Sequence, residues 1–135
     1  MRLYSSDEKI SVDVGTGSIW YSIYSTAMTM ISDKERQEIP LAMEFLKTGE
    51  CPAEHVKETC SQLKTVVDIF SKIPPEKAIY DYRKPNIAPP WKGNIATAVT
   101  SCANLHTTAD GKDLFTEVFK LFDYAEKNKV SILAG

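Results

Sequence analysis

Cysteine and long apolar runs are both scarce in this 135-residue sequence. Its three cysteines, Cys51, Cys60 and Cys102, form an odd set without the spacing of a disulfide framework, so we expect reduced thiols. The most apolar stretch, residues 19–31, contains four Ser and Thr residues and is too short to cross a bilayer. No apolar segment follows a basic start, as it would in a secretory signal. These absences predict a cytoplasmic protein without a membrane span.

The sequence also has no excess of basic residues. Sixteen Lys and Arg residues are scattered among 18 Asp and Glu residues, and the formal net charge is −2. Binding to a phosphate backbone or to an anionic membrane requires a dense cationic surface. We therefore expect neither nucleic acid nor a membrane as a partner, whereas a basic protein partner is compatible with this composition.

Signatures of bound cofactors and metals are missing as well. The turn Gly15-x-Gly17 lies between a strand pattern and a helix pattern, which is the order of a phosphate-binding unit. It lacks both the third glycine of a dinucleotide fingerprint and the Gly-Lys-Ser/Thr of a P-loop, so a plain tight turn is expected. His55 and Cys60 would lie about 140° apart on one helix and would not converge on a metal with Cys51. We expect no cofactor and no metal site.

The apolar residues that are present predict one globular domain over residues 1–135, since 43% of the chain is hydrophobic and 25% is charged. The strongest periodicity predicts a helix over residues 112–128 with Asp110 as its N-cap. Its apolar face covers roughly 160°, which favours a helix wedged against a sheet. That face consists of Leu114, Phe115, Val118, Phe119, Leu121, Phe122 and Ala125.

The remaining patterns predict an α+β fold in which about four helices cover a small, mostly antiparallel sheet. Besides the last helix, helices are expected at residues 19–31, 40–48 and 53–72. In the third of these, the expected apolar stripe is Val56, Cys60, Leu63, Val67 and Phe70. Strands are expected at residues 8–14, 78–82 and 130–134, with 104–108 as a further candidate. Residues 95–104 are a candidate short helix.

Two pairs of residues are candidates for catalysis. Cys102 and His106 would share a helix face, which is the minimum for a thiolate–imidazole pair, but no third orienting group accompanies them. Asp110 and Asp113 could perform acid–base chemistry, but their position at a helix start explains them as caps. We therefore expect no catalytic residues. A small cytosolic enzyme is the alternative that would use one of these pairs.

Four motifs of the C-terminal part carry a family resemblance. Pro-Pro-Trp at residues 89–91, Gly-Asn-Ile at 93–95, Asn-Leu-x-Thr-Thr at 104–108 and Asp-Gly-Lys-Asp-Leu-Phe at 110–115 occur in this order. Together they resemble immunity protein family 70, a group of small bacterial proteins associated with polymorphic and contact-dependent toxin systems. The resemblance is most specific over residues 89–127. His106 stands where an aromatic residue is expected in that family.

The resemblance implies a role rather than a reaction, because the family supplies no catalytic motif. It implies a protein that binds and neutralises a cognate toxin domain inside the cell that makes the toxin. A regulatory protein-binding module without a toxin partner is the remaining alternative. The oligomeric state and the identity of the toxin do not follow from the sequence.

The binding surface is expected on residues 83–94 and the strand before them, because aromatic and charged residues here share a proline-stiffened backbone. Acidic groups nearby would suit the basic cleft of a nuclease toxin. The alternative for Trp91 is a structural role in which it closes the end of the sheet. The candidate toxin-binding residues are Tyr80, Asp81, Tyr82, Arg83, Trp91 and Lys92.

Overall fold

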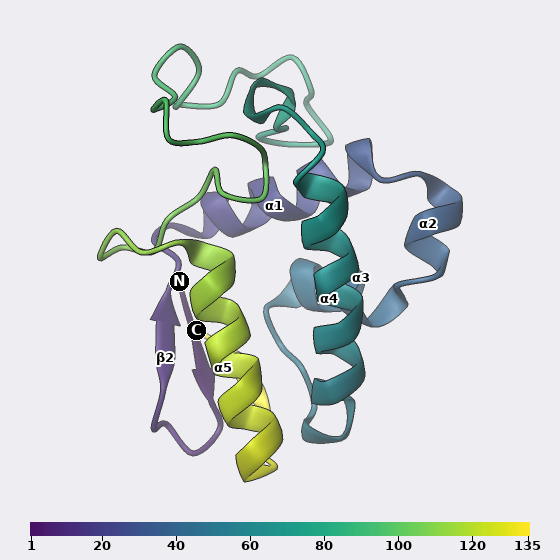
Figure 1. Ribbon diagram of the computed structural model, residues 1–135, viewed down its shortest axis with the longest axis vertical. Helices are drawn as coiled ribbons and strands as arrows, with labels where there is room; N and C mark the ends of the chain where they lie inside the picture. Colours follow the sequence, from purple (N-terminus) through teal and green to yellow (C-terminus); the bar gives the residue numbers. More distant parts are fainter.

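The computed structural model describes residues 1–135 and contains three short strands and five α-helices (Figure 1). The strands are β1 (Arg2–Ser5), β2 (Ser11–Asp13) and β3 (Ile132–Ala134). The helices are α1 (Gly17–Met30), α2 (Asp33–Gln37), α3 (Pro40–Thr48), α4 (Val56–Phe70) and α5 (Leu114–Asn128). Two 3-10 turns, η1 (Ala53–His55) and η2 (Pro75–Lys77), complete the regular structure. The α+β class predicted from the sequence is confirmed.

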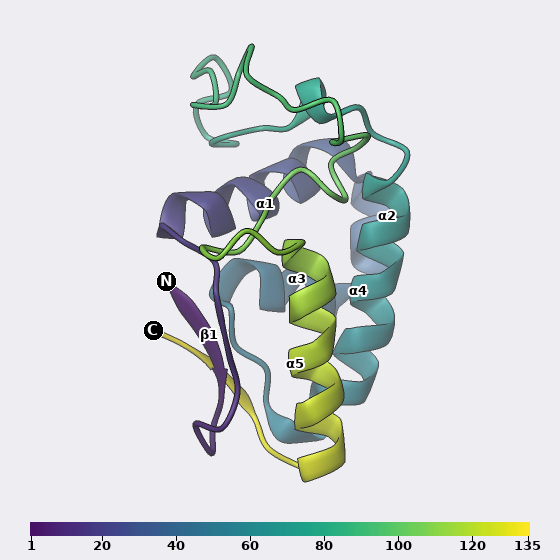
Figure 2. The ribbon, with the colours of Figure 1, turned by 60° about the vertical axis from the view of Figure 1, so that its left-hand side comes forward.

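The sheet is antiparallel with the order β2-β1-β3, so the two ends of the chain lie in neighbouring strands. Leu3 of β1 pairs with Val12 on one side and with Ala134 on the other. Leu3, Val12 and Ile132 are buried, and α5 packs against all three strands (Figure 2). Helix α5 therefore covers one face of the sheet, and α4 packs against α5 on the side away from the strands (Figure 2).

Helix α5 forms the centre of the core, as its periodicity predicts. Six of its seven predicted apolar residues are buried, whereas Phe119 is only half-buried. The ring of Phe122 packs edge-on against Phe45 of α3, with centroids 4.9 Å apart. The predicted start was wrong: Gly111 has a φ of +85°, which breaks the helical path, and the N-cap is Asp113 rather than Asp110. The helix therefore begins at Leu114.

The strand predicted at residues 8–14 is shorter than expected. It pairs with β1, a strand that the sequence pattern did not indicate. Glu8 adopts a left-handed conformation with φ of 61°, which turns the chain between β1 and β2. Val12 and Val14 are buried as predicted, but Ile10 lies in the turn and is only half-buried. The strand predicted at 130–134 is confirmed as β3.

The strand predicted at residues 78–82 was wrong, because side chains of α1 take the place of a neighbouring strand. The backbone carbonyl of Ile79 accepts hydrogen bonds from the hydroxyls of Ser22 at 2.6 Å and Thr26 at 3.3 Å. The amide of Ile79 donates to the Thr26 hydroxyl at 3.0 Å. Ile79 therefore satisfies its backbone polar groups without a ladder, and the chain bends at Tyr80 and turns at Tyr82.

The predicted elements at residues 95–104 and 104–108 were also wrong. Asn104 accepts hydrogen bonds from the amides of Thr100 and Ser101 through its side chain, which forms turns in place of a helix. In the second segment, only an isolated bridge joins Thr107 to Asp113. Residues 71–113, here called the α4–α5 connection, therefore contain no regular element except η2.

The other helices follow the predictions closely. Helix α3 has the predicted bounds of 40–48, and α1 and α4 lie at the predicted positions with slightly different ends. The buried stripe of α4 was placed incorrectly: Thr59 and Val66 are buried, whereas Cys60 and Val67 are half-buried. Helix α4 packs against both α3 and α5, and contact with two neighbours rotates its buried face.

Candidate functional site

Most of the α4–α5 connection lies at one end of the molecule, over α1 and away from the sheet, and its last residues descend to β2 (Figures 1 and 2). Ile79 is fixed to the hydroxyls of α1, as described above. The amide of Cys102 donates to the carbonyl of Ile73 at 2.9 Å, which joins the two halves of the connection. The connection is therefore an ordered layer, and it carries every candidate binding residue predicted from the sequence.

Trp91 lies between two other aromatic rings of this layer. Its ring centroid is 6.0 Å from that of Tyr80 and 5.0 Å from that of His106, and both contacts are edge-on. Trp91 is half-buried and also packs against the hydrophobic core. Part of this side chain therefore has a structural role, and part of it lies at the surface.

Tyr82 belongs to a second aromatic group, formed with α1. Its ring lies 5.9 Å from that of Tyr21 and 5.7 Å from that of Tyr24. The Asp81 carboxylate accepts hydrogen bonds from the Tyr21 hydroxyl at 3.3 Å and from the Arg83 amide at 2.9 Å. Partial burial and the nearby Asp81 carboxylate raise the pKa of Tyr21. Asp81 is thus already engaged within the chain.

A groove of about 570 Å³ lies between the end of α1 and the α4–α5 connection. Tyr80, Trp91 and Lys92 line this groove, so the structure brings together three of the six predicted residues. Asp81, Tyr82 and Arg83 are not among its lining residues and lie beside the second aromatic group. The six residues therefore form two adjoining parts of one surface layer.

The groove also contains two apolar residues that the sequence did not single out. Met30 and Ile87 are the two large hydrophobic side chains that the fold leaves exposed, at 36% and 46%, and both line the groove. Met30 lies outside the apolar stripe that the helical period predicts for residues 19–31, and this position was a signal that it faces away from the core. That stripe consists of Trp20, Ile23, Tyr24, Ala27, Met28 and Ile31. Nothing in the sequence around Ile87 indicated that it would line the same groove as Met30.

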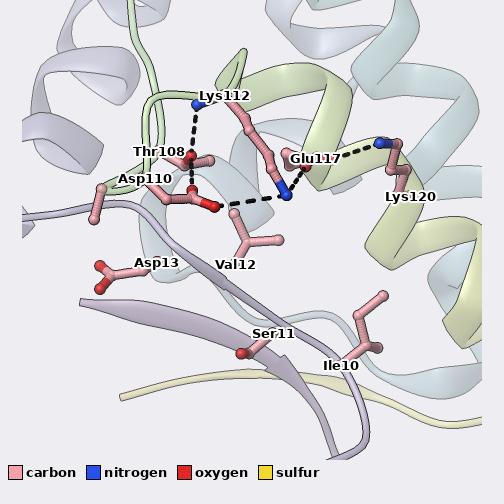
Figure 3. Close-up of a pocket in the computed structure, with 10 residues that line it drawn as sticks. Ile10, Ser11, Val12, Asp13, Thr108, Asp110, Lys112, Glu117 and Lys120 are labelled. Carbon is pink, nitrogen blue, oxygen red and sulfur yellow. Dashed lines mark hydrogen bonds and ion pairs between the residues drawn. The ribbon is translucent and has the colours of Figure 1, made fainter.

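A second, polar cleft of about 630 Å³ lies between β2 and the start of α5 (Figure 3). Lys112 Nζ lies 3.6 Å from Asp110 and 3.5 Å from Glu117, and Lys120 Nζ lies 3.0 Å from Glu117. The Thr108 hydroxyl bonds the Asp110 carboxylate and, with Lys112 nearby, lowers its pKa. Lys120 and Lys112 lower the pKa of Glu117. The carboxylates of Asp110 and Glu117 are therefore ionised and paired at neutral pH.

The residues considered for catalysis have separate structural partners. The Cys102 thiol donates to the carbonyl of Pro74 at 3.5 Å, and burial raises its pKa to about 11. Burial lowers the pKa of His106, beside Trp91, to about 4. A nucleophilic pair needs a thiolate, whereas both groups are neutral at pH 7. Asp113 accepts from the amide and hydroxyl of Thr116 and caps α5.

No group of three or more His, Cys, Asp and Glu side chains is placed to hold a metal ion. None of the helices combines the length and the apolar character that crossing a bilayer requires.

Comparison with known proteins identifies a family for the whole chain. The family model described as Immunity protein 70 matches residues 5–134, so the chain belongs to this family. This confirms the resemblance noted over residues 89–127 and extends it to both ends of the fold. Neither the comparison with curated proteins nor that with solved structures gave a significant match.

Proposed function

We propose that this member of the immunity protein 70 family binds one cognate bacterial toxin domain and blocks its activity without catalysing a reaction. The observation that carries the proposal is the family match over residues 5–134. The engagement of Cys102, His106 and Asp113 in structural contacts agrees with a binding role. Binding would take place in the cytoplasm of the cell that produces the toxin.

The α4–α5 connection is the surface that we propose for the toxin. Interfaces gain most of their binding energy from a few aromatic, Arg or apolar anchors in desolvated positions. This layer offers such anchors around the groove and beside α1, and their neighbours already hold several of the rings in place. Ordering these side chains therefore costs little entropy on binding. The proposed contact residues are Tyr80, Asp81, Tyr82, Arg83, Trp91 and Lys92.

The functional proposal is tested by co-expression with the toxic open reading frame that neighbours the gene. Survival of cells that express both proteins, and death of cells that express the toxin alone, is the expected result. Phe122→Ala, which destabilises the core, serves as the control and should protect the cells less well than wild type. Death of the co-expressing cells despite soluble wild-type protein would contradict the proposal.

The surface proposal is tested separately with Trp91→Ala and Asp81→Lys. Each variant is measured for thermal unfolding and for toxin binding, because Trp91 also contacts the core and Asp81 bonds to Tyr21. Altered binding by a variant that unfolds at the wild-type temperature supports this surface. Unchanged binding by both folded variants would place the interface elsewhere.

A further inference from the structure

The α4–α5 connection has the opposite charge to the rest of the protein. Residues 73–109 contain four basic residues and two acidic ones, which gives a net charge of +2. The complete chain has a net charge of −2, so the remaining residues together carry −4. The basic residues between positions 73 and 109 are Lys77, Arg83, Lys84 and Lys92. The layer that contains the groove is therefore cationic on an otherwise acidic molecule.

The cations of this layer are free to attract a partner. All four are exposed, and none of them takes part in the ion pairs of the structure, which involve other lysines and Arg36. Arg83 instead lies over the ring of Tyr82, 5.7 Å from its centroid. Of the two acidic groups, the Asp81 carboxylate is occupied by Tyr21 and by the Arg83 amide. The second acidic group, Glu76, lines the groove together with Lys77 and Lys92, so the charged groups of the lining carry a net charge of +1.

We propose that the groove receives an apolar side chain presented by an acidic surface of the toxin domain. This inference rests on the proposed function and specifies the chemistry of the partner at the same site. Met30 and Ile87 supply the apolar contact, and Lys77 and Lys92 line the same groove as its cations. Burial of the exposed apolar side chains favours the complex, while the cations accelerate its formation and orient it.

The cationic layer changes the expectation drawn from the sequence. A basic nuclease cleft would be repelled by a net charge of +2, so an acidic face of the toxin is the better match. Nucleic acid is a poorer occupant, because single strands bind through free aromatic faces and a dense basic track. Here Trp91 has edge-on neighbours on two sides.

The test uses a catalytically inactive form of the toxin domain encoded beside the gene. Its association rate and dissociation constant are measured at low and high salt against wild type, Ile87→Ser and the double variant Lys77→Glu/Lys92→Glu. Ile87 and both lysines are exposed, so these variants are expected to fold. Lys57→Glu/Lys64→Glu on α4 is the matched control, because it changes the net charge equally at exposed positions outside the groove.

Ile87→Ser should weaken binding about tenfold through lost apolar contact, mainly by faster dissociation. The double lysine variant should slow association about tenfold at low salt, and the difference should shrink at high salt. The control variant Lys57→Glu/Lys64→Glu should associate with the toxin domain no more slowly than wild type does. Thermal unfolding measured for every variant separates loss of contact from loss of fold.

The outcomes distinguish this inference from the proposed function. If wild type binds the toxin and both groove variants bind it equally well, the inference is overturned and the proposed function remains intact. Absence of binding by wild type would overturn both. Faster association of the double lysine variant would show a basic partner surface and overturn the inference. Tight binding of wild type to a single-stranded oligonucleotide, lost in the lysine variant, would assign the groove to nucleic acid instead.

Discussion

Acidification should destabilise the protein through one buried side chain, His106. This imidazole is only 9% exposed, and its ring lies edge-on to Trp91. Burial lowers its pKa from 6.5 to about 4, because the charged form loses its hydration inside the protein. In the unfolded chain the same imidazole becomes protonated at higher pH. The unfolded state therefore binds one more proton than the folded state across this range.

The size and sign of the effect follow from this difference in pKa. Each unit of pKa difference is worth about 1.4 kcal/mol, so the complete loss is about 3 kcal/mol of unfolding free energy. The stabilisation is fully present above pH 6.5 and declines as the pH falls to about 4. For a domain of ordinary stability, roughly 5–15 kcal/mol, this is a large fraction.

The assay is urea unfolding of wild type and His106→Gln at several pH values between 7 and 4. Asp7, Asp110 and Glu117 have lowered pKa values, so their contributions also weaken in acid in both proteins. The difference between the two proteins isolates His106. His55→Gln changes an exposed histidine and should keep the dependence of the unfolding free energy on pH that wild type shows. Equal loss of stability in His106→Gln and wild type would refute the reasoning.

Three further predictions concern the core, a glycine that lies close to the sheet and the N-cap of α5. Each is tested by measuring the free energy of unfolding. Phe122→Ala should cost about 3–5 kcal/mol because the ring is fully buried, and half-buried Phe119→Ala clearly less. Equal losses would contradict the face assigned to the core. Gly49→Ala should cost about 2–4 kcal/mol, since its Cβ would approach the Cβ of Ala134 at 2.9 Å with φ of +76°. Gly93 has a φ of +80° but no atom within 4 Å of an added Cβ, so Gly93→Ala should cost about 1 kcal/mol. A larger loss at Gly93 would show that backbone strain alone explains the losses at both glycines. Asp113→Ala should cost about 1 kcal/mol and Asp113→Asn much less, whereas equal losses would show that the charge matters more than the cap.

The helices were predictable because their signals are local. The apolar period of α5 is complete within its own sequence, and Pro40 and Gly49 bound α3 on both sides. The start of α5 was misplaced because Asp110 and Asp113 both suit an N-cap. Only the left-handed turn at Gly111 decides between them, and a sequence pattern does not specify that conformation.

The strands were less predictable because their partners lie far away in the sequence. Residues 78–82 have the composition of a strand, but Ile79 bonds to Ser22 and Thr26, more than fifty positions earlier. These hydroxyls lie in the stretch that predicts α1, where they only interrupt the apolar run. A short segment that can satisfy its backbone through side chains cannot be distinguished from a strand by alternation alone.

The candidate site was predictable as a segment but not as a surface. The aromatic residues and prolines of residues 80–92 indicated a stiff loop, and the structure places them in one ordered layer. The groove was not predictable, because Met30 and Ile87 meet only through the fold. The charge of the layer becomes meaningful only when Lys77 and Lys92 are seen to line the groove. These tertiary facts changed the expected partner surface from basic to acidic.

The central claim is that the protein inhibits a toxin by binding it, and stoichiometric inhibition in vitro tests this most directly. The activity of the purified toxin domain encoded beside the gene is titrated with purified wild-type protein. The account predicts that activity falls linearly and reaches zero near one equivalent, with a stable complex on gel filtration. Full toxin activity at a large molar excess, or loss of toxin only through substoichiometric turnover by this protein, would contradict it.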